Sequence, residues 1–271
     1  MKKIICLCLS IMICFTAFNS VFAEYNENPR GLEQGDYETI VRWNIRTAIE
    51  RLSQLDIVRN PLEKWGEDDP IKRRNAFEMA YIARFGGSRE LYKPEDLPSW
   101  FPEQVKHIAA DVDPNSYDGS LLFLLSSDSL LYGRKDAEGN KIAAFDEHMT
   151  YYEAISLVSR LLTVFNRIYY TLWQEMDSWQ EEYKDYRFAE EVGLINSNTL
   201  VNYSTLTVDK SQLNDPIPAY EFMYLLYTVL YIPTFVHDDY GILPNQIRYI
   251  DYFTKPNPPE IEYDENMIYI P

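Results

Sequence analysis

The sequence predicts an all-α fold in which three helix–loop–helix units surround a shared apolar centre. Apolar residues recur at helical spacing through most of the chain, and no stretch shows the sustained alternation of a strand. A pattern of helix, polar loop and second helix also occurs three times. We expect this domain to cover residues 38–235, with approximate repeats at 38–86, 98–172 and 173–235, a central long helix and an irregular acidic C-terminal tail.

The first 23 residues have the features of a secretory signal peptide. Lys2 and Lys3 precede an apolar run, and the small residue Ala23 closes the segment at a typical cleavage position. Residues 24–37 are polar and rich in turn formers, which indicates a leader or linker. All of the cysteines fall inside the signal segment, so we expect a secreted mature chain without a disulfide or a cysteine ligand: Cys6, Cys8 and Cys14.

The charge balance restricts the possible partners. The chain carries 25 basic and 42 acidic residues, a net charge of −17, and cleavage after Ala23 removes two lysines to leave −19. So strong a negative charge argues against nucleic acid and against anionic membrane surfaces. We therefore expect neither nucleic acid nor, after signal cleavage, a membrane as a partner.

Helical patterns account for most of the mature chain. The segment from Tyr37 closes on the apolar pair Ile57 and Val58, and residues 154–172 carry an apolar seam with steps of 4, 3, 4, 3 and 4, which predicts one long helix. A further helical pattern runs through residues 222–229 and ends before Pro233. Residues 236–271 are rich in proline and acids, which favours an extended flap or a partly disordered end.

Each of the three units has a first helix that ends in an apolar pair, a polar loop with Gly or Asn, and a second helix with Thr or Pro at its start. The second helices are expected to begin at Ile71, Met149 and Ile217, a period of roughly seventy residues. This arrangement resembles the S-layer homology (SLH) family, whose repeat has a helix ending in Gly-Ile-Ile, a glycine-containing loop and an Ile-Thr-Arg-Ala-Glu helix start. The similarity is carried by "EEVGLI" at 190–195, by the loop at 132–146 and by "MTYYEA" at 149–154.

The helix starts also have a local physical explanation. Thr150 can accept from free backbone N–H groups while Glu153 answers three residues later, which is a capping box. Glu221 lies in the first turn of its helix after Pro218, where a negative charge is favourable. These residues therefore have a structural role to set against any binding role.

The resemblance implies that the motif arginine grips an acidic sugar of a cell-wall polymer, since a guanidinium can pair with a carboxylate. Arg73 fills this slot in the first unit, whereas Tyr151 and Ala219 replace it in the other two. The competing interpretation is that the basic residues around Arg73 are cations on a solvated helix end. The predicted glycan-binding residues are Lys72, Arg73, Arg74, Trp65, Tyr151, Glu153 and Glu221.

Sequence motifs for metal binding or catalysis are weak in this chain. The loop "DVDPNSYDG" at 111–119 alternates oxygen ligands like a calcium site, but it lacks the required glycine and final acid, so a hydrogen-bonded turn is favoured. His107, His148 and His237 lack zinc-binding spacing. We expect no catalytic residue, no metal and no cofactor. Aromatic side chains crowd residues 169–186 and could stack on sugars, although core packing is favoured.

The leading hypothesis is a non-enzymatic protein at a bacterial cell surface that associates with cell-wall polysaccharide or another envelope protein. One alternative is a secreted polysaccharide hydrolase that uses an Asp/Glu pair. Another is a protein–protein scaffold with the acidic tail as its docking segment.

Overall fold

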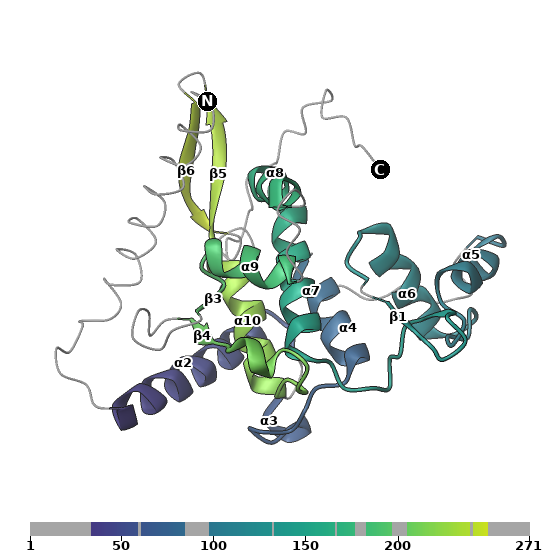
Figure 1. Ribbon diagram of the computed structural model, residues 1–271, viewed down its shortest axis with the longest axis horizontal. Helices are drawn as coiled ribbons and strands as arrows, with labels where there is room; N and C mark the ends of the chain where they lie inside the picture. Colours follow the sequence, from purple (N-terminus) through teal and green to yellow (C-terminus); the bar gives the residue numbers. More distant parts are fainter. Residues whose placement is uncertain are drawn as a thin grey trace.

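The computed structural model describes residues 34–58, 61–84, 98–131, 133–165, 167–176, 183–196, 205–238 and 241–248. The expected signal peptide therefore lies outside the described residues. The fold is mainly α-helical, as predicted (Figure 1). The helices are α2 (Gln34–Gln54), α3 (Pro61–Lys64), α4 (Arg73–Arg84), α5 (Phe101–Ile108), α6 (Tyr117–Ser127), α7 (Tyr151–Phe165), α8 (Arg167–Glu175), α9 (Lys184–Glu191), the 3-10 turn Lys210–Gln212 and α10 (Ala219–Tyr231).

Three chain segments, residues 69–73, 147–151 and 215–219, meet at the centre of the molecule and are called the hub below. Their middle residues Ile71, Met149 and Ile217 are fully buried. The Ile71 N–H donates to the Ile217 carbonyl over 3.1 Å, the Ile217 N–H donates to the Met149 carbonyl over 2.9 Å, and the Met149 N–H donates to the Ile71 carbonyl over 2.9 Å. The three hydrogen bonds thus close a ring in which every segment donates to one neighbour and accepts from the other.

A second ring of hydrogen bonds lies where the helices start. The backbone N–H groups of Arg73, Tyr151 and Ala219 donate to the carbonyls of residues 147, 215 and 69 over 2.9, 3.1 and 2.8 Å. The first N–H groups of a helix have no partner within their own helix, so a buried helix start needs acceptors from elsewhere. The hub supplies those acceptors across the junctions between units.

Prolines occupy the alternate positions of the hub. Pro70 and Pro216 directly precede Ile71 and Ile217, and Pro218 lies between Ile217 and Ala219, so none of them takes a position whose N–H group forms a ring. Successive residues of an extended segment direct their N–H groups to opposite sides, so a proline is tolerated only where no donor is required. The proline positions therefore agree with the register of the hub.

The helices pack around the hub in a cyclic order. The second helices α4, α7 and α10 contact one another, α6 packs on α4, α9 packs on α7, and α2 packs on α10 (Figure 1). Each first helix therefore covers the second helix of the preceding unit, and α2 closes the cycle against the last one. The expected meeting of the three helix starts is observed.

The three first helices end in the same way. Asp56, Ser129 and Gly193 adopt left-handed backbone conformations with φ of 57°, 57° and 77°. In each case this residue donates to the carbonyl three positions back, and the following N–H, that of Ile57, Leu130 or Leu194, donates to the carbonyl five positions back. This hydrogen-bond pair is the Schellman motif, which turns the chain so that the apolar residues after it enter the core. Ile57, Leu130 and Leu194 are all buried, as the predicted apolar pairs require.

Two expectations are corrected. Helix α2 already begins at Gln34, so the predicted leader is shorter than residues 24–37. Of the predicted long helix, Tyr151–Phe165 and Arg167–Glu175 are helical as α7 and α8, and residue 166 lies outside the described residues. Pro233 ends α10 as predicted, but the tail then forms an antiparallel hairpin instead of an irregular flap, with strands β5 (Pro233–Asp238) and β6 (Gly241–Arg248). Residues 249–271 lie outside the described part.

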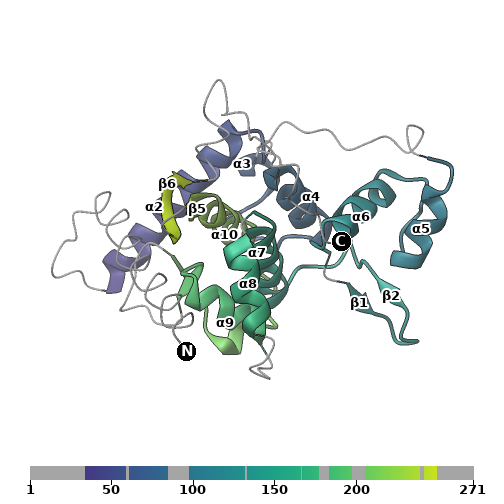
Figure 2. The same ribbon diagram turned by 90° about the horizontal axis from the view of Figure 1, so that it is seen from above.

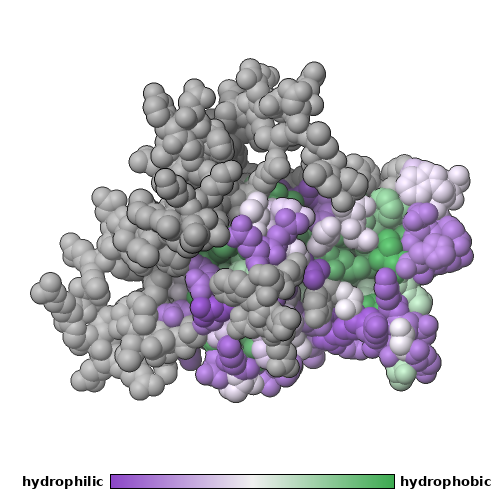
Figure 3. Space-filling model, turned by 45° about the horizontal axis from the view of Figure 1, so that its top comes forward, coloured by the Kyte–Doolittle hydropathy of each residue, from purple (hydrophilic) through white to green (hydrophobic). Residues whose placement is uncertain are grey.

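The first helix of the second unit and the loop after it lie with α5 on one side of the molecule. Helices α5 and α6 and the hairpin of β1 (Arg134–Lys135) and β2 (Lys141–Ile142) lie together there (Figure 2). The same side presents the apolar surface that is coloured green in Figure 3. In the third unit, β3 (Ile195–Asn196) and β4 (Leu206–Thr207) form a short parallel pair at the corresponding place.

A glycine at the left-handed position of the second unit should stabilise the fold. Ser129 has φ 57°, where a Cβ atom is unfavourable, while the third unit has Gly193 at the same place. We expect Ser129→Gly to raise the free energy of unfolding by about 0.5–1 kcal/mol and Gly193→Ala to lower it by about 1 kcal/mol. Urea unfolding of both variants measures this, and a destabilised Ser129→Gly would contradict the assignment of the motif.

Candidate functional site

The predicted site residues lie on or beside the hub, but the structure divides them among different surroundings. Two residues after Ile71, Met149 and Ile217 come Arg73, Tyr151 and Ala219, which are called the second residues of their units. Four residues after the same starting points come Asn75, Glu153 and Glu221, which are called the fourth residues. The second residue of one unit faces the fourth residue of the next in both junctions that have polar side chains, which makes these positions the candidate functional site.

At the first junction, Arg73 is fully buried and forms an ion pair with Glu153. The Nη1 atom lies 2.6 Å from Glu153 Oε1, and both side chains are almost inaccessible, with exposures of 0% and 7%. The Nε–H of Arg73 donates to the carbonyl of Ala143 over 2.9 Å, and the guanidinium lies over the ring of Phe77. The expectation that Arg73 lies on a solvated helix end is therefore wrong, because the following unit encloses it.

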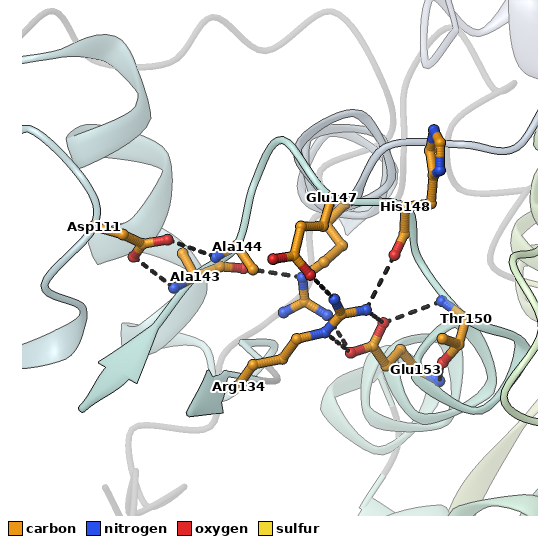
Figure 4. A network of polar contacts seen from close by, with 9 residues as sticks. Asp111, Arg134, Ala143, Ala144, Glu147, His148, Thr150 and Glu153 are labelled. Atoms are coloured by element: carbon orange, nitrogen blue, oxygen red, sulfur yellow. Dashed lines mark hydrogen bonds and ion pairs between the residues drawn. The ribbon is translucent and has the colours of Figure 1, made fainter. Parts of the chain in front are cut away.

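A second arginine, Arg134, also contacts Glu153, and it is not among the site residues predicted from the sequence. Arg134 leaves β1 and donates to Glu153 through Nε and Nη2, both over 2.7 Å (Figure 4). It also pairs with Glu147 and donates to the carbonyl of His148 over 3.0 Å. The two arginines and two glutamates form a charge-balanced network, called the Glu153 network below.

The predicted capping box of α7 is confirmed. The backbone N–H of Glu153 donates to Thr150 Oγ1 over 3.3 Å, and the backbone N–H of Thr150 donates to Glu153 Oε2 over 3.1 Å. Burial alone would raise the pKa of Glu153, but the hydrogen bonds from Arg134 and the charge of Arg73 outweigh burial and hold the pKa below its ordinary value. Glu153 is therefore an ionised carboxylate with both oxygens engaged.

At the second junction, a tyrosine takes the place of the arginine. The hydroxyl of Tyr151 donates to Glu221 Oε2 over 2.5 Å, and Tyr151 is 7% exposed. Burial, and then the bonded carboxylate, raise the pKa of Tyr151, so the hydroxyl stays a neutral donor. Burial also raises the pKa of Glu221, and the charge of Asp68 raises it further, although the Tyr151 hydrogen bond acts in the opposite direction. The same pair of positions thus holds an arginine–carboxylate ion pair at one junction and a hydrogen bond from a neutral hydroxyl to a carboxyl at the next.

The third junction has no polar pair of this kind, because Ala219 is apolar. Instead, the hydroxyl of Tyr220 donates to the carbonyl of Trp65 over 3.2 Å, which ties α10 to the first unit. Trp65 is half-buried against the core, and the Lys64 ammonium lies 5.7 Å from its ring centre. The Trp65 carbonyl therefore helps to close the third junction, while the Trp65 ring packs against the core.

Lys72 and Arg74, the neighbours of Arg73, point to other partners. Lys72 has a side chain that is 51% exposed, and its Nζ lies 3.4 Å from Asp146 Oδ1. Arg74 is more enclosed: its Nε donates to Asp118 Oδ1 over 2.6 Å and its Nη1 to Glu78 over 3.1 Å. The predicted basic cluster is therefore dispersed, and Lys72 is its most exposed member.

The calcium-like loop is a hydrogen-bonded turn that supports the Glu153 network. Asp113 Oδ1 accepts from the backbone N–H of Asn115 over 2.9 Å, and the Ser116 hydroxyl caps α6. Asp111 accepts from the backbone N–H groups of Ala143 and Ala144 over 2.7 and 2.8 Å (Figure 4). Because the carbonyl of Ala143 receives Arg73, Asp111 fixes one acceptor of the buried arginine.

Within the described ranges, no group of three or more histidine, cysteine, aspartate or glutamate side chains is arranged to hold a metal ion. The described helices also include none with the length and apolarity needed to cross a membrane. What the site provides is a set of mutually satisfied polar groups between units. Such a set stabilises and specifies the assembly of the units.

Comparison with known proteins gives no further assignment. The chain matches no family model, no curated protein and no solved structure.

Truncation of Arg73 should destabilise the protein. Removing one partner of a buried ion pair typically costs about 3–5 kcal/mol, and we expect the lower end for Arg73→Ala because Arg134 continues to neutralise Glu153. Arg73→Lys should fall between this variant and the wild type, because lysine keeps the charge but not the forked geometry. Urea unfolding checks this, with Lys72→Ala as the control expected within about 0.5 kcal/mol. A wild-type midpoint for Arg73→Ala would contradict the buried pair.

The two junction glutamates should respond oppositely to neutralisation. The lowered pKa of Glu153 adds stability that is present above the ordinary glutamate pKa and lost as the pH falls below it. The raised pKa of Glu221 adds stability that is present at low pH and lost as the pH rises through the raised value. At pH 7 we therefore expect Glu153→Gln to cost about 3 kcal/mol, whereas Glu221→Gln should be neutral or stabilising by up to about 1 kcal/mol.

Urea unfolding at pH 7 and pH 4 separates these effects. Both differences from the wild type should be smaller at pH 4. For Glu153 the unfolded carboxyl becomes protonated first, so its stability contribution begins to fall, and for Glu221 the folded carboxyl with its raised pKa takes up its proton. Destabilisation by both variants at pH 7 would show that Glu221 requires its charge.

Proposed function

We propose that this chain is an exported, non-enzymatic envelope protein whose residues 38–235 form three SLH-like units, and that it associates with the glycan of a bacterial cell wall or with another envelope protein. The observation that carries the proposal is the ring of hydrogen bonds at the hub. It joins the three positions at which the resemblance places the helix-start motif.

Two further regularities support three equivalent units. Each first helix ends in the same left-handed turn followed by a buried apolar residue. Each first helix also packs on the second helix of the preceding unit. A single unit of this kind cannot bury its own apolar face, which is the reason that repeat units of a protein assemble. The signal-like residues 1–23 add the expectation of export.

The proposed ligand contact departs from the resemblance in one respect. An arginine that grips a sugar carboxylate has to present free donors to it, but Arg73 uses its guanidinium on Glu153 and Ala143 within the fold. Among the residues first predicted to bind glycan, Lys72 keeps the most accessible side chain. We therefore propose that Arg73, Tyr151, Glu153 and Glu221 hold the units together and that the wall ligand lies outside these junctions.

The engagement of the junction carboxylates weighs against the hydrolase alternative. Glycoside hydrolysis requires one carboxylate free to act as base or nucleophile and another free to donate a proton. Glu153 accepts from Arg134, Arg73 and the Thr150 backbone, while Glu221 accepts from the Tyr151 hydroxyl. Either glutamate would have to break these contacts to act on a substrate.

Cosedimentation with purified sacculi tests the proposal. The secreted chain should be retained on untreated sacculi more strongly than an unrelated protein of similar size and negative charge. Extraction of the secondary polymer with acid should release it if the polymer is the partner, and protease treatment of the sacculi should release it if the partner is an envelope protein. Retention no greater than that of the control protein would reject the proposal.

A further inference from the structure

Two aromatic side chains on α8 form a surface that core packing does not explain. Tyr170 is 44% exposed, whereas its neighbour Tyr169 is 8% exposed and belongs to the core. Trp173, one turn further along the helix, is half-buried. The Tyr170 and Trp173 rings are nearly parallel, with an interplanar angle of 26° and centres 6.4 Å apart. The Tyr170 ring is stacked on Trp173, and the exposed outer face of Tyr170, backed by Trp173, is called the α8 aromatic platform below.

The platform is held rigidly from its buried side. The indole N–H of Trp173 donates to Asp185 Oδ1 over 2.7 Å, and Asp185 is 5% exposed. The Lys184 ammonium lies 3.4 Å from the centre of the Trp173 ring, so α9 fixes both the edge and one face of the indole. An aromatic ring that is already immobile loses little conformational entropy when a ligand stacks on it.

The outer edge of the platform is polar. The Gln174 side-chain amide donates to the Tyr170 hydroxyl over 2.7 Å, which fixes the hydroxyl oxygen while leaving its proton free to be donated outward. Gln174 and Thr171 are also exposed beside the ring. An apolar face bordered by hydroxyl and amide groups matches the face of a pyranose, whose C–H groups are apolar and whose rim is hydroxylated.

We propose that the α8 aromatic platform is a carbohydrate-binding site that stacks an uncharged pyranose on the outer face of Tyr170, with Trp173 behind that ring. The inference rests on the proposed association with envelope glycan and specifies its ligand class. The net charge of −17 disfavours an acidic sugar, the Lys184 ammonium beside the platform is already packed on the Trp173 ring, and Arg73 is engaged inside the fold. The platform lies on α8, beyond the end of α7, and so outside the hub (Figure 1).

Trp100, another exposed aromatic group, is less suited to sugar stacking. Trp100 is 55% exposed on the side of the molecule with α5 and α6, where Figure 3 shows apolar surface. Its ring is tilted by 58° against Phe123, which is itself edge-on to Phe101. Tilted rings pack against one another and do not offer one flat face. Trp100 therefore provides a matched control for an exposed aromatic outside the platform.

Calorimetric titration of the full secreted chain with soluble oligosaccharides tests the inference. The probes are neutral hexamers of glucose, mannose and N-acetylglucosamine, with a uronic acid oligomer as the acidic counterpart. We expect at least one neutral hexamer to bind more tightly than the uronate. Tyr170→Ala should weaken that binding about tenfold, equivalent to about 1.4 kcal/mol, because the stacking face is lost. Tyr170→Phe should stay closer to the wild type, and Trp100→Ala should leave the affinity unchanged.

Thermal melting of each variant verifies that it is folded. The inference is overturned if no neutral hexamer binds, if the uronate binds more tightly, if Tyr170→Ala binds like the wild type, or if Trp100→Ala loses affinity to the same extent. Cosedimentation with sacculi separates the two proposals. Retention of Tyr170→Ala at the wild-type level would reject the platform and leave wall association intact, whereas absent retention of the wild type would reject wall association and leave the titration to decide the platform.

Discussion

The hydrogen-bond ring among Ile71, Met149 and Ile217 is the constraint on which the rest of the structure depends. Each segment satisfies one neighbour with its N–H and the other with its carbonyl, so the removal of any segment would leave a buried donor and a buried acceptor unpaired. The same register brings the helix starts together and directs the second residue of one unit toward the fourth residue of the next. Side-chain pairing at the junctions is therefore a consequence of backbone geometry.

That geometry explains why an arginine and a tyrosine make equivalent contacts at two different junctions. Arg73 and Tyr151 occupy equivalent positions, and each donates to the glutamate that starts the next second helix. The arginine contact is charged and is reinforced by Arg134, whereas Tyr151 offers a neutral donor and burial holds the pKa of Glu221 above its ordinary value. Burial of a full ion pair requires compensation from several donors, and at the first junction Arg134 of β1 supplies two of them. A neutral donor is therefore the less demanding solution at the other polar junction.

Local rules made parts of this structure predictable. Thr150 and Glu153 follow the spacing of a capping box, Pro233 ends a helix because it cannot continue one, and the apolar residues after each first helix enter the core. Arg134 was not predictable, because its side chain reaches Glu153 only after the β1–β2 hairpin returns to the hub. The burial of Arg73 likewise depends on a unit seventy residues away, and three neighbouring cations in sequence resemble a solvated helix end until that unit is in place. Sequence patterns report contacts within a turn of helix, whereas the site is made of contacts between units.

The separation of the hub from the α8 aromatic platform follows from the same energetics. A buried polar network stabilises a fold only when every member is satisfied, and a ligand that competed for Glu153 or Arg73 would have to replace each contact that it broke. A ligand can bind at a lower cost in folding free energy to a surface whose side chains do not join the units to one another. Tyr170 is exposed, while the ring beside it is anchored by Asp185 and Lys184. In a chain whose junction arginine has been enclosed, a rigid aromatic face on a peripheral helix is thus the place where ligand binding costs the fold least.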